Sequence, residues 1–202
     1  MQVKICGITS VCETRFINEY RPDYIGIVMF FQKSKRNRKP DEAAEIISCL
    51  AKDIKKVAVT VSPTKEQIEI IEKLGFDYLQ IHGQTDDELI TSAKLPVWRA
   101  FNVSNMGMYH HYKGLSNIAG YVFDAGEPGS GRIFDWNSLE EIERDDRLFI
   151  LAGGLKPENV RLAIAAVQPD VVDVSSGVEY TDRPGKDEER VRKFIHEVRA
   201  ID

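Results

Sequence analysis

Eight short apolar runs recur along the chain, and each is followed by a segment of mixed polarity. Several of these runs are rich in β-branched residues and show no alternation of apolar and polar positions. A strand of this composition is buried on both faces, which is typical of a parallel sheet covered by helices. The predicted strands are Val3–Cys6, Tyr24–Met29, Lys56–Val61, Tyr78–Ile81, Val97–Phe101, Gly120–Asp124, Leu148–Ala152 and Val171–Val174.

The segments between these strands mostly predict helices. Thr64 can cap one of them because Glu66 and Gln67 follow it, and Gly75 ends the same helix. The segment 103–117 is the weakest candidate because it contains two glycines, so any helix there is expected to be short. The clearest predicted helices are Pro40–Ala51, Thr64–Leu74, Asn159–Val167 and Asp187–Val198.

The alternation of strands and helices decides the fold class. Eight alternations in 202 residues, without a break in composition, predict an α/β fold of the compact (β/α)8 barrel type, with a single domain over residues 1–202. The alternative is an open doubly wound sheet, which usually has fewer strands and a phosphate loop after the first one. Here the first strand leads into CGITS, which matches neither glycine-rich nucleotide motif, and GEPGSG at 126–131 has the wrong spacing for one. The barrel is therefore favoured.

Charge and cysteine content exclude several classes of protein. Charged residues make up 29% of the chain and the formal net charge is −5, so a nucleic-acid partner is not expected. The densest basic stretch, KSKRNRK at 33–39, is either a solvated loop or part of a site. No apolar run approaches the ~18 residues of a membrane span. The odd cysteine count, three, disfavours both a disulfide framework and a zinc site, so we expect a cytoplasmic protein without a bound metal.

In a barrel of this type the active site lies where the strands end. Two successive strands end in small residues, within LAGGLKPENV at 151–160 and DVSSGVE at 173–179. Glycines let backbone N–H groups approach an anion, and the loops after the last two strands are the common phosphate site of such barrels. Ordinary tight turns are the alternative for each loop alone. The predicted phosphate-binding residues are Gly153, Gly154, Ser175, Ser176 and Gly177.

Cys6 and Asp124 are the candidate acid–base pair. Cys6 ends the first strand on the same face as Lys4, and a nearby cation favours the thiolate, which can accept a proton. Asp124 ends the sixth strand, where partial desolvation would keep its carboxyl group protonated and able to donate. The alternatives are an inert buried cysteine and a turn residue. A base and an acid across a barrel mouth suit an isomerisation by proton transfer.

Asp173 and His82 are the remaining candidates at strand ends. Asp173 either pairs with Lys4 inside the barrel or contacts substrate hydroxyl groups. His82 either binds a ligand at the mouth or satisfies a loop carbonyl group. The other histidines are expected at the surface; they are His110, His111 and His196.

Six motifs, in this order along nearly the whole chain, carry a family resemblance. They are VKICGIT (3–9), KSKR (33–36), LQIHG (79–83), FDAGEPGSGRIFDW (123–136), LAGGLKPENV and DVSSGVE. With them the sequence resembles the phosphoribosylanthranilate isomerases of tryptophan synthesis. The resemblance implies a barrel without a cofactor that acts on a small phosphorylated substrate, as a monomer or homodimer. The reaction it implies is the Amadori rearrangement of N-(5′-phosphoribosyl)anthranilate to an aminoketose.

The resemblance also implies roles for individual residues. Cys6 would be the general base, Asp124 the general acid and Arg36 the contact of the anthranilate carboxylate, while backbone amides of the last two loops would hold the phosphate. The segment GIVMFFQKSKR is one residue longer than the family pattern and lacks its proline, so Arg38 competes with Arg36.

Three other functions stay open at this point. The first is the related aminoaldose isomerase of histidine synthesis, or an isomerase that serves both pathways, although that enzyme resembles two half-barrels and uses two aspartates. The second is a barrel that binds phosphate ligands without catalysis, which would not need both Cys6 and Asp124. The third is a redox role for Cys6 with Cys12 as its partner, which would require the first helix to move.

Overall fold

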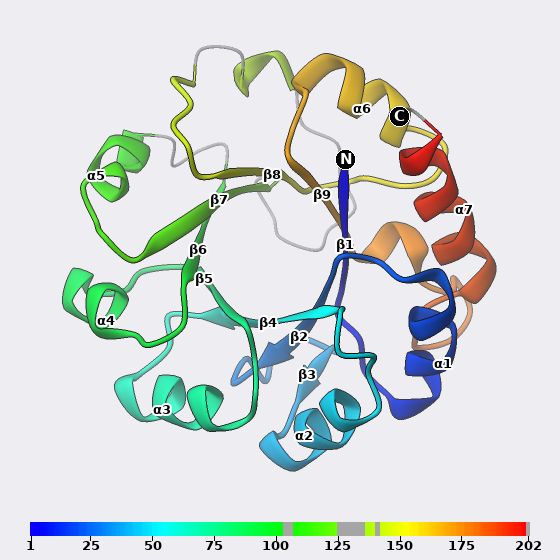
Figure 1. Cartoon of the computed structure of the whole chain (residues 1–202), viewed down its shortest axis with the longest axis horizontal. Coiled ribbons are helices and arrows are strands. Elements are labelled where there is room, and N and C mark those ends of the chain that lie inside the picture. Colours follow the sequence, from blue (N-terminus) through cyan, green and yellow to red (C-terminus); the bar gives the residue numbers. More distant parts are fainter. Residues whose placement is uncertain (103–106, 125–135, 140–141, 201–202) are drawn as a thin grey trace.

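Eight parallel strands close into a barrel in the computed structural model, which describes residues 1–102, 107–124, 136–139 and 142–200. β1 pairs with both β9 and β2, and this double pairing closes the sheet (Figure 1). All eight predicted strands are present, with ends shifted by at most two residues. The barrel strands are β1 (Gln2–Cys6), β2 (Tyr24–Met29), β4 (Lys55–Val61), β5 (Tyr78–His82), β6 (Val97–Asn102), β7 (Ile118–Asp124), β8 (Leu148–Leu151) and β9 (Val171–Val174).

One short strand was not predicted. β3 (Asn37–Arg38) pairs with the end of β2, at Val28 and Met29. It lies within the basic stretch 33–39, where the lysines are mostly exposed but Arg36 and Arg38 are partly buried. The solvated-loop interpretation is therefore wrong for the two arginines, because β3 fixes this segment beside the barrel mouth.

Helices cover the outside of the barrel (Figure 1). The predicted capping of α3 is confirmed: the Thr64 hydroxyl accepts from the Gln67 amide, the Gln67 side chain accepts from the Thr64 amide, and Gly75 takes a φ of +84° after the helix. The helix before β7 is short, as expected, whereas α4 was not predicted. The helices are α1 (Val11–Tyr20), α2 (Pro40–Ser48), α3 (Lys65–Lys73), α4 (Asp87–Ser92), α5 (Tyr109–Lys113), α6 (Val160–Val167) and α7 (Glu188–Arg199), with 3₁₀ turns η2 (Trp136–Leu139) and η3 (Ser176–Val178).

Strand alternation separates an outer core from the barrel interior. In β1, Val3 and Ile5 pack outward against the helices, while Cys6 belongs to the inner cluster. At the amino end of the barrel the interior is filled by Tyr24 and Trp98, whose rings lie 4.9 Å apart. This aromatic floor closes one end of the barrel, so the polar interior residues above it face only the opposite mouth.

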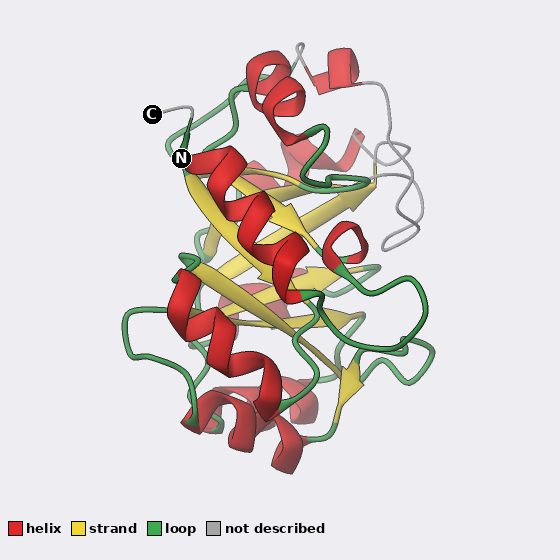
Figure 2. Ribbon diagram, turned by 90° about the vertical axis from the view of Figure 1, so that its right-hand side faces the viewer, coloured by secondary structure: helices red, strands yellow, loops and turns green. Residues whose placement is uncertain are grey.

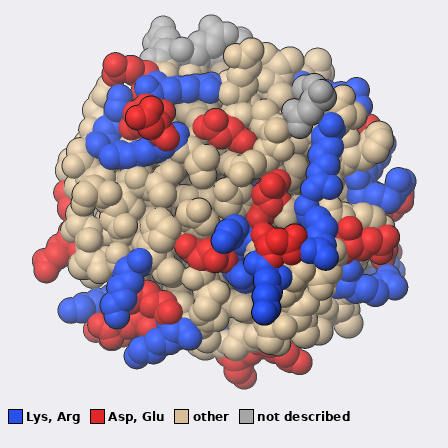
Figure 3. Space-filling model, in the orientation of Figure 1, with Lys and Arg blue, Asp and Glu red and all other residues tan. Residues whose placement is uncertain are grey.

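The strands run from left to right in Figure 2, so the loops that follow them gather at the right of that view. Figure 3 shows the opposite face, the one toward the viewer in Figure 1. Basic and acidic side chains are interspersed among the described residues drawn there. None of the helices in the described ranges is long and apolar enough to cross a membrane.

Candidate active site

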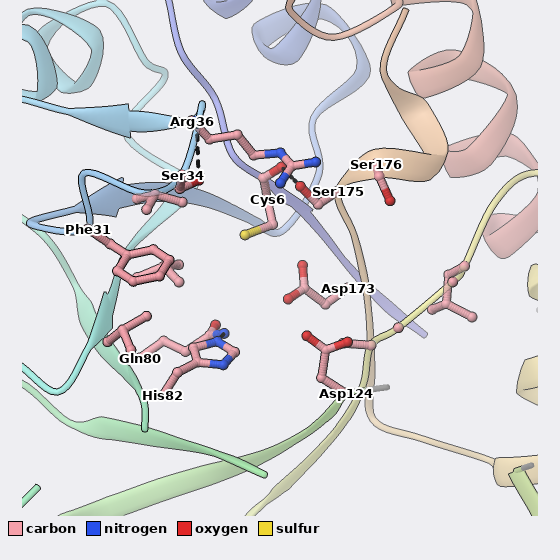
Figure 4. A pocket seen from close by; sticks show the side chains of 17 residues that line it. Cys6, Phe31, Ser34, Arg36, Gln80, His82, Asp124, Asp173, Ser175 and Ser176 are labelled. Carbon is pink, nitrogen blue, oxygen red and sulfur yellow. Dashed lines mark hydrogen bonds between the residues drawn. The ribbon is translucent and has the colours of Figure 1, made fainter. Parts of the chain in front are cut away.

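A pocket opens at the carboxyl ends of the strands, where the sequence predicted a site. Side chains from β1, β5, β7 and β9 converge on it, together with the loops after β2, β8 and β9 (Figure 4). With one exception, Gly177, the predicted site residues all line this pocket. They are Cys6, Arg36, His82, Asp124, Gly153, Gly154, Asp173, Ser175 and Ser176.

A buried ion pair lies beside the cysteine. The Lys4 ammonium group is 2.7 Å from Oδ2 of Asp173, and both side chains are buried. A Cβ atom at Gly26 would lie 2.8 Å from the Cys6 sulfur and 3.2 Å from Lys4 Nζ, so only glycine leaves room for both groups. Burial alone would lower the pKa of Lys4, but Asp173 and Cys6 raise it above its usual value. Lys4 is therefore a permanent cation under the site.

Asp173 pairs with Lys4, one of the two interpretations that the sequence left open, and its contact with substrate hydroxyl groups stays a prediction. Its Oδ2 atom accepts from Lys4, as the structural pairing requires. Its Oδ1 atom is buried and has no hydrogen-bond partner among the residues that the structure describes, although Asp173 lines the pocket. A buried acceptor without a partner is costly, and a hydroxyl group of a bound ligand would satisfy it.

The thiol of Cys6 is less acidic than the sequence suggested. Burial raises its pKa, Lys4 lowers it, Asp173 raises it and Lys186 lowers it, and the net pKa lies above the ordinary value. Lys4 acts in the predicted direction, but Asp173 neutralises much of its field and burial prevails. The unliganded protein thus carries a neutral thiol near neutral pH, and ionisation requires further positive charge nearby.

Asp124 ends β7 and is 8% exposed. Its carboxyl group points into the same space as Cys6 and Asp173 in Figure 4. β9 and β8 lie between β1 and β7 in the barrel, so Cys6 and Asp124 approach a ligand from well-separated strands. The loop that follows, including GEPGSG at 126–131, is outside the described residues.

His82 pairs with Gln80, a residue that the sequence analysis did not single out. The Gln80 amide nitrogen and His82 Nε2 lie 2.7 Å apart at the end of β5. Burial, together with the charges of Lys4 and Arg99, lowers the pKa of His82 to about 3. The imidazole is therefore neutral, and it contacts a side chain instead of the loop carbonyl group considered above.

The two predicted phosphate loops lie side by side. Gly153 and Gly154 have φ values of +83° and +66°, which favour glycine. The amides of Gly153, Gly154 and Ser176 donate no hydrogen bond within the described part of the chain. Gly177 does not line the pocket, and a Cβ atom on it would lie 1.9 Å from the Leu155 carbonyl oxygen. Its role is to let the two loops meet, which leaves the other amides facing the pocket.

Arg36, not Arg38, is the arginine of this pocket. Arg38 donates to the Lys35 carbonyl group and lies 3.6 Å from Glu42. Arg36 lines the pocket and forms a bidentate ion pair with Glu179, in which Nε lies 2.5 Å from Oε1. This pair was not predicted, although Glu179 closes the motif DVSSGVE.

Predictions from the sequence also concern the cysteines, possible metal ligands and the other histidines. Cys12 is exposed, Cys6 is buried, and both thiols are free. Within the residues that the structure describes, no group of three or more histidine, cysteine or acidic side chains is arranged to hold a metal ion. His110, His111 and His196 are exposed, as predicted.

Comparison with known proteins identifies the family. A sequence profile of N-(5′-phosphoribosyl)anthranilate isomerases matches residues 3–197. The chain belongs to this family. It is 39% identical to the N-(5′-phosphoribosyl)anthranilate isomerase of Caldanaerobacter subterraneus subsp. tengcongensis, over 100% of this chain and 99% of that one. The family resemblance, the barrel and the isomerase class predicted from the sequence are thereby confirmed.

Solved structures agree with this assignment. The phosphoribosyl anthranilate isomerase of Thermotoga maritima is 35% identical and superposes with a TM-score of 0.86, over 99% of each chain. A phosphoribosyl anthranilate isomerase solved in complex with reduced 1-(o-carboxyphenylamino)-1-deoxyribulose 5-phosphate is 33% identical, with a TM-score of 0.85 over 99% of each chain.

Proposed function

We propose that this chain catalyses the Amadori rearrangement of N-(5′-phosphoribosyl)anthranilate to 1-(2-carboxyphenylamino)-1-deoxyribulose 5-phosphate in tryptophan biosynthesis. The observation that carries the proposal is the convergence of Cys6 and Asp124 on one pocket that two glycine-rich loops also line. In this proposal Cys6 is the proton acceptor, Asp124 is the proton donor, and backbone amides that have no partner in the described part of the chain bind the phosphate. A phosphorylated aminoaldose needs all three.

Asp124 acts first in this proposal, as a general acid. Its protonated carboxyl group donates to the furanose ring oxygen, and the C1′–O bond breaks to leave an iminium cation on the substrate. The iminium group acidifies the proton on C2′. Asp124 is buried at the end of β7, and its protonated form before the reaction is part of the proposal.

Cys6 then removes the C2′ proton as a thiolate, and the electron pair of the C–H bond moves to give an enolamine. Tautomerisation of the enolamine yields the ketone. The raised pKa of the free thiol is offset in the complex, because the iminium cation adds positive charge beside Lys4. Each proton transfer contributes on the order of 10²–10⁴-fold to the rate.

The remaining residues bind the substrate. The amides of Gly153, Gly154 and Ser176, which donate to no described residue, hold the phosphate, with Ser175 beside them and Gly177 behind. Asp173 Oδ1 accepts from a sugar hydroxyl group, and the neutral His82 contacts the substrate from β5, at another part of the pocket lining. Arg36 binds the anthranilate carboxylate. Binding energy from the two ends of the substrate serves to position the reacting carbons between Cys6 and Asp124.

The proposal is tested by supplying two aminoaldoses to the wild-type protein. We expect turnover of N-(5′-phosphoribosyl)anthranilate, and we expect Asp124→Asn to lose nearly all of it while its affinity for a phosphate ligand persists. Turnover of the histidine-pathway aminoaldose alone would overturn the assignment. Binding of both without turnover would leave a phosphate-binding barrel.

The proposal also covers the cellular location and the oligomeric state of the protein. The three cysteines are unpaired, as a reducing compartment would leave them, and we place the protein in the cytoplasm. We keep monomer and homodimer as the two alternatives for its oligomeric state.

A further inference from the structure

The ion pair between Arg36 and Glu179 uses only one edge of the arginine. Nε lies 2.5 Å from Oε1 and Nη2 lies 3.1 Å from Oε2. A guanidinium group has five N–H donors in a planar fork, so it can serve two carboxylates on different edges. Nη1 donates to no other group within the described residues, while the arginine lines the pocket. One edge is thus occupied and donors remain for a ligand.

Glu179 is a buried carboxylate in contact with three cations. Besides Arg36, the ammonium groups of Lys35 and Lys186 lie 2.9 Å and 3.1 Å from its carboxylate oxygens. Burial alone would raise the pKa of Glu179, but hydrogen bonds from Arg36 and Lys35 and the charge of Lys186 lower it to about 2. Glu179 is therefore an anion whenever the protein is folded near neutral pH. Such a carboxylate holds its partners in a fixed geometry.

Lys186 connects this carboxylate to the phosphate loop and to the first strand. Its ammonium group is fully buried and donates to the Ser175 carbonyl at 3.0 Å and lies 3.3 Å from the Ser175 hydroxyl. The Ser175 hydroxyl in turn donates to the Cys6 carbonyl at 2.9 Å. The backbone amide of Lys186 is held by Glu13, whose carboxylate also caps α1. The network joins both ends of the proposed substrate site.

We propose that Glu179 is a positioning residue that makes the site selective for a carboxylate on the aromatic ring. It holds the Nε–Nη2 edge of Arg36 so that the remaining donors meet the ligand without first being ordered. Gly7 supports this placement, because a Cβ atom there would lie 2.5 Å from Arg36 Cδ. The inference rests on the proposed function, since the recognised group is the anthranilate carboxylate.

Three physical alternatives predict different binding patterns. If Glu179 only added negative charge, its removal would tighten every anionic ligand. If it only stabilised the fold, its removal would weaken every ligand alike. If it competed with the substrate for Arg36, its removal would tighten the carboxylate ligand alone. A positioning role predicts a fourth pattern, in which only the carboxylate ligand is weakened.

The experiment compares two non-reactive ligands by calorimetric titration. One is reduced 1-(o-carboxyphenylamino)-1-deoxyribulose 5-phosphate, and the other is the same compound built on aniline, without the carboxylate. In Glu179→Gln we expect the carboxylate ligand to bind about tenfold more weakly, which is the usual effect of losing one well-oriented hydrogen bond to a charged group. The aniline compound should bind as it does to wild type. KM should rise in parallel while kcat changes little.

Glu188→Gln is the matched control, because it removes the same charge from an exposed ion pair with Arg15. Its ratio of the two affinities should equal that of wild type. If Glu179→Gln does not fold, Glu179→Gln/Lys186→Met removes both buried charges together. The affinity ratio should fall in the double variant too, whatever happens to phosphate binding.

If the ratio of the affinities for the carboxylate ligand and the aniline ligand is the same in Glu179→Gln as in wild type, or is higher, the role of Glu179 is overturned. The proposed reaction is not affected by that result. A wild type that binds both ligands equally overturns the role of Arg36 as well. Loss of turnover in wild type would be a failure of the proposed reaction, and it is measured separately from this ratio.

Discussion

Replacing Lys4 with methionine removes the only described cation that pairs with Asp173. Methionine has nearly the length of lysine, so the packing inside the barrel is largely kept. Asp173 would then be a buried carboxylate with neither oxygen paired, since Oδ1 already lacks a partner among the described residues. The variant therefore isolates the cost of an uncompensated buried charge.

The magnitude follows from the 2.7 Å separation. At an effective dielectric constant of about 20 the attraction is roughly 6 kcal/mol, but moving two ions out of water costs several kcal/mol each, so the intact pair is close to neutral overall. Removing one partner leaves the desolvation cost uncompensated, and we expect a loss of roughly 3–5 kcal/mol in the free energy of unfolding. In a chain of 202 residues this lowers Tm by roughly 6–20 °C.

The assay is urea denaturation near neutral pH of wild type, Lys4→Met, Asp173→Asn and the double variant. The double variant has no buried charge at this position, so it should regain most of the lost stability and end within about 2 kcal/mol of wild type. If Lys4→Met stays within about 1 kcal/mol of wild type, Asp173 does not depend on Lys4. If the double variant is as unstable as Lys4→Met, packing and not charge is responsible.

Three further predictions concern the other site residues. Gly177→Ala should weaken phosphate binding and lower Tm, because the added Cβ would overlap the Leu155 carbonyl group. Gly114→Ala, at an exposed position, is the control and should change neither phosphate binding nor Tm. Equal Tm values for the two variants would refute the role of Gly177. The ring of His82 should stay neutral, with NMR shifts that are flat from about pH 5 to about pH 8, since its pKa is about 3; a midpoint near the ordinary value would contradict it. The value of kcat/KM should rise with pH through an apparent pKa above the ordinary thiol value of about 8.5. This is expected because Cys6 must lose a proton and burial raises the pKa of its thiol. A kcat/KM that falls with pH over that range would exclude the thiolate as the base.

Much of the fold could be predicted from the sequence because the barrel strands are buried on both faces, which gives them a uniformly apolar composition. Both faces of strands such as Ile25–Val28 are buried, so their composition reports the sheet directly. β3 escaped prediction because its two residues, Asn37 and Arg38, pair only by virtue of the tertiary position of β2. A two-residue strand leaves no periodic pattern.

The site was predictable where a residue closes a strand, and less so where partners come from distant segments. Cys6, Asp124 and Asp173 follow from alternation and strand ends. The ion pair of Arg36 joins residues 143 positions apart, and Lys186 lies in a turn beyond the last motif. The pKa of Cys6 could not be derived from Lys4 alone either, since burial and Asp173 together outweigh it.

The central claim, that Cys6 is the base of an aminoaldose isomerisation, is tested most directly by the fluorescence decay of freshly made N-(5′-phosphoribosyl)anthranilate. Wild type and Cys6→Ala are compared side by side, with binding of the reduced product analogue measured for both. We predict rapid loss of fluorescence with wild type only, while Cys6→Ala still binds the analogue. Rapid loss with both proteins would remove Cys6 from the mechanism, and no loss with either would contradict the proposed reaction.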